Sequence, residues 1–317
     1  MSLKYNGLNL NDGKCPIASN ILETVGHTPL VRLNRLNLTS SVHILVKMES
    51  FNPAASVKDR LAIALIAEAQ RKGLKDGGTM IIASSGNTGI GLAMACAALS
   101  YKCVITMPEN MSLERRSLMH AFGAEIILTD AAEGMDGSIV KAEVLAAENN
   151  YILLNQFDSL YNASFHYKST GPEIWRDSNG KVDIFVSGVG TGGTFSGVAR
   201  YLKEKNRKLK AIAVEPADSA VLSGEQRGAH QIQGIGAGFI PPVLDKALID
   251  EIIAVSNEDA LQTTRRLAKE EGIFCGISAG AAVYAAIQTT QRVENKGKNI
   301  VVILPDTGEH YLTSGVF

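Results

Sequence analysis

From Val42 onward, short runs of β-branched residues alternate with longer segments of helical periodicity. The first cycles comprise VHILVKME, a helical segment over 56–73, TMIIA, a helical segment over 87–100 and YKCVITMP. The alternation continues to KNIVVILP near the end of the chain, with glycines and polar residues at nearly every junction. Strands that alternate with helices predict an α/β fold of mostly parallel sheets covered by helices.

One segment, 218–245, interrupts this alternation. It contains GEQRGAH and the glycine-rich IQGIGAGFIPP, and both are too polar and too flexible for a core element. Because a long irregular loop inside a compact chain is usually functional or mobile, we expect this segment to be one or the other.

Size and charge limit the classes of partner. A chain of 317 residues exceeds the size at which one hydrophobic core stops growing, so two lobes or one large α/β domain are expected. Lys and Arg total 31 against 32 for Asp and Glu, which leaves no long-range field to attract nucleic acid or anionic lipid. A small-molecule partner is therefore favoured over nucleic acid or a membrane.

Cysteine and histidine spacing gives no metal or disulfide signal. Cys15, Cys96, Cys103 and Cys275 lie far apart without a CxxC pair, which predicts reduced, mostly buried thiols, and the histidines show no ligand spacing. The first residues lack the pattern of a targeting segment, and no apolar run approaches membrane-spanning length. We therefore expect a cytoplasmic protein without a bound metal.

Two glycine-containing loops are candidates for anion binding. SGVGTGGT (187–194) follows the apolar strand VDIFV, and SSGNTG (84–89) follows TMIIA; each loop opens a helix. Small residues at a helix N-terminus let backbone N–H groups close around an anion. A phosphorylated cofactor joined to an amino-acid carboxylate needs two such loops, whereas a nucleotide phosphate needs one.

The first loop also permits a dinucleotide-binding interpretation. Gly188, Gly190 and Gly193 have the spacing of that fingerprint, and Glu215 follows about 20 residues later, where a ribose-binding acid would stand. A nicotinamide dehydrogenase is therefore an alternative that the sequence alone leaves open.

Two further positions carry possible chemistry. Lys58 stands at the start of an apolar helix directly after small residues, a place suited to a desolvated amine nucleophile. The alternative is that Lys58, Asp59 and Arg60 are surface charges of a first helical turn capped by Ser56. In GISAGA, Ser278 offers a hydroxyl at a helix entry, although a serine there is more commonly an N-cap.

Taken together, six motifs carry a resemblance to one family. NPAASVKDR, SSGNTG, NQF, GTGGT, IQGIGAGFIP and GISAGA resemble, in this order, the cysteine synthase (O-acetylserine sulfhydrylase) branch of the fold-type-II pyridoxal-phosphate enzymes, which are tryptophan synthase β-like. The resemblance implies a two-lobed fold. Residues 48–158 would form a smaller mobile substrate-binding lobe, and residues 1–47 plus 159–317 a larger cofactor-binding lobe.

The resemblance also implies roles for individual residues. Lys58 would form the Schiff base with pyridoxal 5'-phosphate and move the Cα proton, and Ser278 would face the pyridine nitrogen. The implied cofactor-binding set is Lys58, Asn87, Gly190, Thr191, Gly192, Gly193, Thr194 and Ser278. The implied substrate-binding set is Ser84, Ser85, Gly86, Asn87, Thr88, Gln156 and Gly234, and no metal is implied.

The implied reaction is a β-replacement that forms L-cysteine from O-acetyl-L-serine and sulfide through an aminoacrylate, by a transferase with a lyase-like β-elimination half-reaction. A homodimer is implied, as is a possible partner, serine acetyltransferase, whose tail would dock near 234–239. β-Cyanoalanine synthase, which uses cysteine and cyanide, is the alternative, although it tends to carry other residues at Thr88, Ser187 and Thr191. Cystathionine β-synthase is disfavoured by the NQF motif, and a non-catalytic binding protein by the complete residue set.

Overall fold

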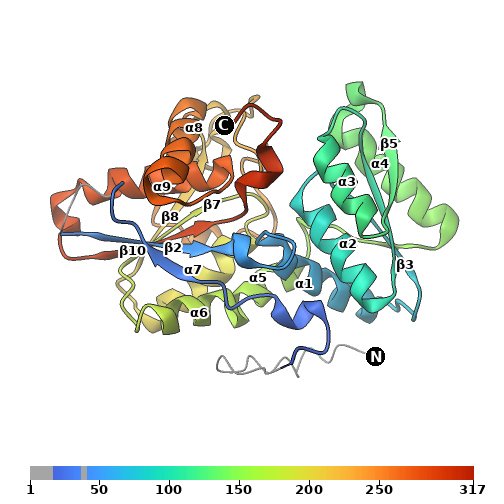
Figure 1. The fold of residues 1–317 in the computed structure, drawn as a ribbon, viewed down its shortest axis with the longest axis horizontal. Coiled ribbons are helices and arrows are strands. Elements are labelled where there is room, and N and C mark those ends of the chain that lie inside the picture. Colours follow the sequence, from blue (N-terminus) through green and yellow to red (C-terminus); the bar gives the residue numbers. More distant parts are fainter. Residues whose placement is uncertain (1–16, 37–40) are drawn as a thin grey trace. The chain divides into compact units, whose positions relative to one another are not determined.

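The computed structural model describes residues 17–36 and 41–317, which form two compact units. Unit 1 consists of the described part of Met1–Val25 together with Asn52–Tyr161, and unit 2 of Gly26–Phe51 and Asn162–Phe317. Each unit contains its own sheet (Figure 1). Cys15 and the N-terminal segment considered for targeting lie outside the described residues.

Unit 1 is built on a parallel sheet with the strand order β5-β4-β3-β6. Its strands are β3 (Thr79–Ala83), β4 (Lys102–Pro108), β5 (Glu125–Thr129) and β6 (Ile152–Leu153). Its helices are α1 (Lys58–Arg71), α2 (Asn87–Leu99), α3 (Leu113–Ala121) and α4 (Gly134–Asn149), with short 3₁₀ turns at Ile21–Thr24 and Ala131–Glu133.

The two faces of this sheet are covered by different helices. Helix α4 packs Ala142 and Ala146 against Ile81 and Val104 on one face. Helix α2 begins over the opposite face, where the space beside Gly89 is bounded by Ile105 and by Met119 of α3. The alternation of neighbouring residues Val104 and Ile105 between these faces is the two-residue period of a strand buried on both sides.

Unit 2 contains a larger sheet with the order β1-β2-β10-β7-β8-β9, in which β1 alone pairs antiparallel among the described strands. The strands are β1 (Leu30–Arg32), β2 (His43–Met48), β7 (Ile184–Gly188), β8 (Lys210–Pro216), β9 (Glu251–Val255) and β10 (Asn299–Leu304). The helices are α5 (Leu160–Lys168), which begins at the boundary between the units, α6 (Thr170–Asp177), α7 (Gly193–Lys205), α8 (Asn257–Arg266), a π-helical turn (Leu267–Glu271) and α9 (Ile277–Thr290).

Helices cover both faces of the larger sheet. Ile184 and Val186 of β7 pack in the cluster that includes residues of α8 and α9, whereas Phe185 packs with Phe195 and Val198 of α7. The prediction of an α/β fold with mostly parallel, helix-covered sheets is therefore confirmed.

Several local differences from the predicted elements have physical causes. Strand β9 was not predicted, because its five residues EIIAV follow shortly after the irregular segment and carry no glycine boundary. The helical stretch ending near Trp175 is two helices interrupted at Ser169, and β6 is shortened to Ile152–Leu153. Segment 218–245 is largely irregular, as predicted, apart from short 3₁₀ turns at its start.

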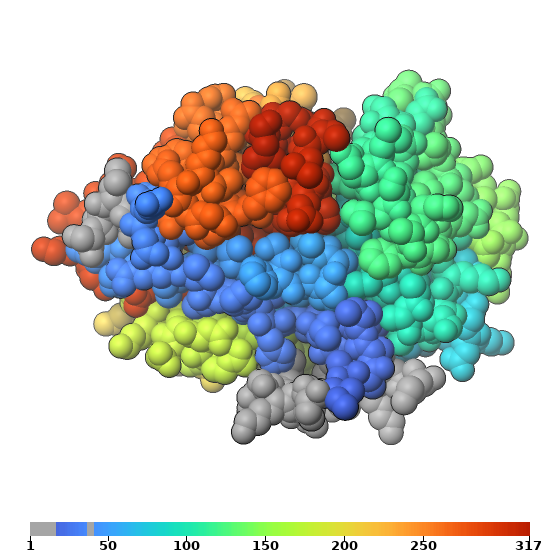
Figure 2. Space-filling model, viewed as in Figure 1, coloured from blue at the N-terminus to red at the C-terminus, as the bar shows by residue number. Residues whose placement is uncertain are grey.

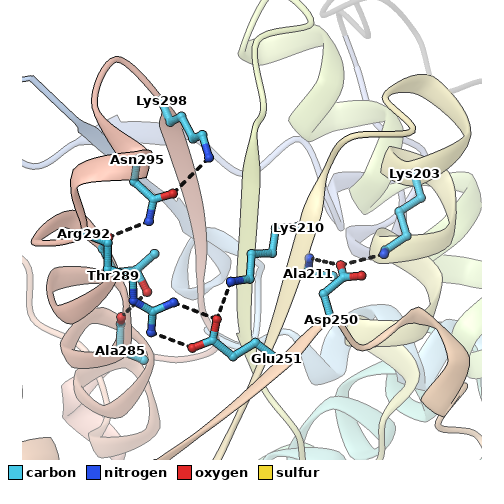
Figure 3. A network of polar contacts seen from close by, with 10 residues as sticks. All are labelled: Lys203, Lys210, Ala211, Asp250, Glu251, Ala285, Thr289, Arg292, Asn295 and Lys298. Atoms are coloured by element: carbon cyan, nitrogen blue, oxygen red, sulfur yellow. Dashed lines mark hydrogen bonds and ion pairs between the residues drawn. The ribbon is translucent and has the colours of Figure 1, made fainter.

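The edge of the sheet at β9 is bordered by charged side chains (Figure 3). The guanidinium of Arg292 donates two hydrogen bonds to the Glu251 carboxylate, at 2.6 and 2.7 Å, and Lys210 Nζ lies 2.5 Å from the same group. Asp250 accepts from Lys203 Nζ at 2.6 Å and from the Ala211 backbone N–H at 2.7 Å. Charged pairs at an edge strand oppose pairing with another chain.

The C-terminal residues pack against the helical layer of unit 2. Arg265 of α8 donates to the carbonyl of Val316 at 2.6 Å, and the rings of Phe274 and Phe317 lie 4.5 Å apart. In Figure 2 the dark red C-terminal segment lies beside the orange part of the chain, which precedes it in the sequence.

Three further observations concern membrane, metal and thiol chemistry. Within residues 17–36 and 41–317, no helix combines the length and the apolar character needed to cross a bilayer. In the same ranges, His, Cys, Asp and Glu side chains form no group of three or more that could hold a metal ion. Cys96, Cys103 and Cys275 are buried and form no disulfide.

Candidate functional site

Lys58 is the first residue of helix α1, as predicted. Its backbone N–H donates to Ser56 Oγ at 3.2 Å, and its side chain is partly buried. Asp59 accepts from the Ala54 backbone N–H at 2.6 Å, which fixes the small-residue segment in front of the helix. Because Asp59 and Arg60 are both 0% exposed, the interpretation of this turn as a set of surface charges is wrong.

Helix α2 constrains the position of Lys58. A Cβ atom at Gly91 would lie 3.1 Å from the carbonyl oxygen of Lys58 and 3.3 Å from the amide nitrogen of Asp59. The absence of a side chain at Gly91 therefore allows the two helices to approach closely at the residue that carries the amine. This role of Gly91 was not recognised from the sequence, where the only signal was a second glycine two residues after Gly89.

The SSGNTG loop joins β3 to the N-terminus of α2. Ser84 is buried, and its Oγ accepts from the Gly89 N–H at 3.0 Å, which holds the loop closed. Thr88 Oγ1 donates to Gln156 Oε1 at 2.6 Å. The structure thus brings the predicted substrate-binding residues of unit 1 together, although Gln156 lies 68 positions further along the chain.

The loop before α7, Gly190–Thr194, has the geometry of an anion-binding site, and we call it the anion cradle. Gly192 is the N-cap of α7 with φ of 84°, a left-handed conformation that favours glycine. A Cβ atom at Gly190 would lie 2.2 Å from the carbonyl oxygen of Gly234, and one at Gly193 would lie 2.0 Å from Asn162 Oδ1. Side chains are thus excluded at both positions. The resulting bare helix start, flanked by the hydroxyls of Thr191 and Thr194, fits a phosphate group.

The glycine-rich loop and Ser278 lie beside this cradle in unit 2. The Gly236 N–H donates to the carbonyl of Val189 at 3.0 Å, and a Cβ atom at Gly234 would lie 3.7 Å from Ser278 Oγ. The N-cap of α9 is Gly276, so the interpretation of Ser278 as an N-cap is wrong. The predicted residues Gly190–Thr194, Gly234 and Ser278 are therefore neighbours at one end of the larger sheet.

Glu215 does not have the environment of a ribose-binding acid. It is 1% exposed, and its carboxylate accepts from the backbone N–H groups of Leu222 at 2.7 Å and Ser223 at 3.0 Å. The Ser223 hydroxyl donates a further bond at 2.6 Å. Because the carboxylate stabilises the chain turn after β8, Glu215 is not available to bind a ribose, as the dinucleotide interpretation requires.

Helix α5 contributes two residues that the sequence did not single out as site residues. Asn162 Nδ2 donates to Thr191 Oγ1 at 3.0 Å. One turn later, His166 Nε2 lies 3.1 Å from Thr194 Oγ1, and its Nδ1 lies 2.8 Å from Thr170 Oγ1. The i, i+4 spacing of Asn162 and His166 places both on one helix face, which was the available signal.

A family model described as "Pyridoxal-phosphate dependent enzyme" matches residues 21–306. The chain belongs to this family. The match spans both sheets, so the family assignment covers the lysine at the start of α1 as well as the anion cradle before α7.

Several relatives of this pyridoxal-phosphate dependent enzyme are cysteine synthases by name. Cysteine synthase A of Escherichia coli strain K12 is 52% identical over 305 residues, which covers 93% of this chain and 94% of the relative. A cysteine synthase of Staphylococcus aureus strain Mu50 is 48% identical over 300 residues, which covers 94% and 96%. The crystal structure of cysteine synthase from Entamoeba histolytica superposes with a TM-score of 0.93 at 46% identity, covering 97% of this chain and 93% of that one.

The cofactor of this pyridoxal-phosphate dependent enzyme is pyridoxal phosphate, and its fold is the α/β fold-type-II architecture. The anion cradle is consistent with that cofactor. It offers a helix N-terminus and two hydroxyls to a phosphate, and side chains are excluded at Gly190 and Gly193. The assignment of the remaining residues to cofactor and substrate stays a prediction, as do the roles of the two lobes bounded at residues 48 and 158.

Proposed function

We propose that the protein catalyses the β-replacement of O-acetyl-L-serine by sulfide to give L-cysteine and acetate. The observation that carries this proposal is the 52% identity with a cysteine synthase A across 93% of the chain. Supporting it, the residues that the resemblance assigns to cofactor and substrate are all present, and each unit holds its own subset close together.

Lys58 is the proposed catalytic residue. Its ε-amine is the nucleophile that would hold the cofactor, and Nζ would accept the proton from the substrate Cα. Bound pyridoxal phosphate supplies the electron sink for that proton removal. The close approach of Gly91 to the Lys58 backbone fixes the part of the chain from which the amine extends.

The substrate carboxylate is assigned to the SSGNTG loop and Gln156. The first backbone N–H groups of α2 and the hydroxyls of Ser84 and Ser85 favour an anion at this helix start, whereas the Thr88 hydroxyl acts through Gln156. Because Thr88 donates to Gln156 Oε1, the amide nitrogen of Gln156, which is a donor, is directed away from Thr88. A carboxylate is the acceptor that such an arrangement suits.

The nature of the group at the cofactor ring favours elimination over transamination. Ser278, assigned to the pyridine nitrogen, carries a neutral hydroxyl. A hydroxyl stabilises a protonated ring nitrogen less than a carboxylate does, so the bound cofactor would be a weaker electron sink, which would favour loss of the β substituent over transamination.

The test of this function is product identification with purified protein. O-Acetyl-L-serine, O-phospho-L-serine and L-cysteine are each supplied with sulfide or cyanide, and products are identified by mass spectrometry. We expect O-acetyl-L-serine with sulfide to give L-cysteine at the highest kcat/KM. Faster formation of β-cyanoalanine from cysteine and cyanide would favour the alternative synthase instead.

A lysine variant tests the assigned catalytic residue. Lys58→Ala removes both the amine nucleophile and the proton acceptor, so we expect kcat to fall by at least about 100-fold. Lys75→Ala, which removes an exposed lysine of the same unit, is the matched control and retains wild-type turnover. Equal cysteine formation by Lys58→Ala and wild type would refute the assignment.

Finer parts of the proposal concern assembly and location. We propose a homodimer located in the cytoplasm, and a serine acetyltransferase as possible partner at the loop 234–239. Phe239 at the end of that loop and the next residue, Ile240, are exposed apolar side chains, a surface suited to an apolar peptide end. Light scattering tests the dimer, and titration with an acetyltransferase tail peptide, followed by the cofactor absorbance, tests the partner.

A further inference from the structure

Asn162 lies beneath the anion cradle of unit 2. The residue is 1% exposed, and its Nδ2 donates to Thr191 Oγ1 at 3.0 Å. A buried side-chain amide requires partners for its polar atoms, so a defined contact with a loop hydroxyl fixes both groups.

The direction of this hydrogen bond determines what Thr191 can do. An amide nitrogen only donates, so Thr191 Oγ1 is the acceptor, and the single hydroxyl proton of Thr191 points elsewhere. A hydroxyl that is already an acceptor is prepared to donate to an anion. A phosphate oxygen, which only accepts, is the complementary group.

The glycine at position 193 makes this arrangement possible. A Cβ atom there would lie 2.0 Å from Asn162 Oδ1 and 2.2 Å from its Cγ, so the carboxamide occupies the space that a side chain would need. The Asn162 amide is therefore confined between the start of α7 and Thr191. Confinement of this kind preserves the orientation of the hydroxyl when no ligand is bound.

We propose that Asn162 is a positioning residue for the cofactor phosphate, which acts by holding the Thr191 hydroxyl as a donor toward a phosphate oxygen. The inference rests on the proposed function in one respect, the assignment of Thr191 to the phosphate. Asn162 itself does not touch the reacting atoms.

The experiment measures cofactor binding, not turnover. Full-length apoprotein is titrated with pyridoxal 5'-phosphate and, separately, with pyridoxal, which lacks the phosphate. For Asn162→Ala we expect the dissociation constant of pyridoxal phosphate to rise about 10- to 100-fold, the range of one hydrogen bond to a charged group. The dissociation constant of pyridoxal is expected to stay within about twofold of wild type, because the lost bond serves the phosphate alone.

Two further variants test the mechanism of positioning. Asn162→Asp replaces the donor by a carboxylate, which accepts the Thr191 proton and repels phosphate, so we expect weaker binding than for Asn162→Ala. Thr191→Val removes the hydroxyl itself. If Asn162 acts through Thr191, adding Asn162→Ala to Thr191→Val should change the dissociation constant by less than about twofold, as a coupled pair requires.

A control separates positioning from general loss of stability. Asn295 is a buried asparagine of the same unit whose Nδ2 donates to the carbonyl of Thr289 at 2.8 Å, in the network of Figure 3. Asn295→Ala should lower the apoprotein unfolding temperature as Asn162→Ala does, with unchanged affinity for pyridoxal phosphate.

The possible failures are distinguishable. Wild-type apoprotein that does not bind pyridoxal phosphate would overturn the proposed function and, with it, this inference. Wild-type binding together with unchanged affinity of Asn162→Ala, or an equal loss of affinity for pyridoxal, would overturn the inference alone.

Discussion

At the edge strand β9, neighbouring cations determine the pKa of one carboxyl group, that of Glu251. The hydrogen bonds from Arg292, together with Lys210, lower the pKa of Glu251 to about 2, from an ordinary value of 4.5. Because the folded pKa lies below that of the unfolded chain, the Glu251 carboxylate stabilises the fold above about pH 4.5. That contribution is lost as the pH falls toward 2.

A glutamine substitution tests this linkage. At pH 7 we expect Glu251→Gln to lower the free energy of unfolding by about 1 kcal/mol, a modest value because the pair is partly exposed to solvent. The difference from wild type should shrink between about pH 5 and pH 2, the interval over which the unfolded and then the folded carboxylate is protonated. Urea unfolding at several pH values measures it, and a difference that does not change with pH would contradict the assignment.

At the scale of elements, the contact between α1 and α2 depends on a glycine. Replacing Gly91 by alanine would gain up to about 1 kcal/mol of helix propensity. The new Cβ would, however, lie 3.1 Å from the Lys58 carbonyl and 3.3 Å from the Asp59 nitrogen, which are backbone atoms that cannot rotate away. Crowding typically costs about 1–3 kcal/mol, so the steric term is expected to win.

We therefore predict that Gly91→Ala lowers both the unfolding temperature and kcat, because α1 moves at the residue that carries the amine. The matched comparison on the same helix is Gly89→Ala, whose Cβ would meet the thioether end of Met119 at 2.8 Å. That flexible end can rotate away, so Gly89→Ala should cost less stability. Thermal unfolding and steady-state kinetics of both variants decide the point, and equal stability losses would contradict it.

At the scale of the whole molecule, each unit has its own sheet and its own packed core. Within unit 2, a buried cluster of charged side chains surrounds Lys47. Lys47 of β2 is 0% exposed; its Nζ lies 2.9 Å from the Glu173 carboxylate and donates to the Thr28 carbonyl at 2.5 Å. The cluster connects the sheet to helix α6. Trp175, the single tryptophan of the chain, lies on the same helix and reports on this unit.

Lys47→Met would leave the buried Glu173 carboxylate without this cation, so we predict a loss of about 3–5 kcal/mol. The loss should be visible as a lower urea midpoint of Trp175 fluorescence. Lys203→Met, which removes a more exposed ion pair with Asp250, serves as the control and should cost at most about 1 kcal/mol. Equal shifts of the urea midpoint for the two variants would show that the buried cluster stabilises the unit no more than the exposed ion pair does.

Much of this organisation was predictable from local patterns. The start of α1 at Lys58, the two glycine-containing loops that open α2 and α7, and the parallel strands follow from glycine placement and from the two periodicities of buried chains. Strand β9 was missed because an edge strand has few local constraints and is defined by its pairing with β8. Spacing could not distinguish the role of Glu215 in the turn after β8 from a ribose-binding role.

The sequence by itself determined the α/β class, the positions of the helix-entry loops and the start of α1 at Lys58, because these depend on residues that are neighbours in the chain. Tertiary structure alone decided that Asn162 supports Thr191, that Gly91 lies against Lys58 and that Gln156 pairs with Thr88. Each of these contacts joins residues that are 29 to 68 positions apart in the sequence. Such contacts form only when packed elements bring the groups within hydrogen-bonding or van der Waals distance, which no local periodicity encodes.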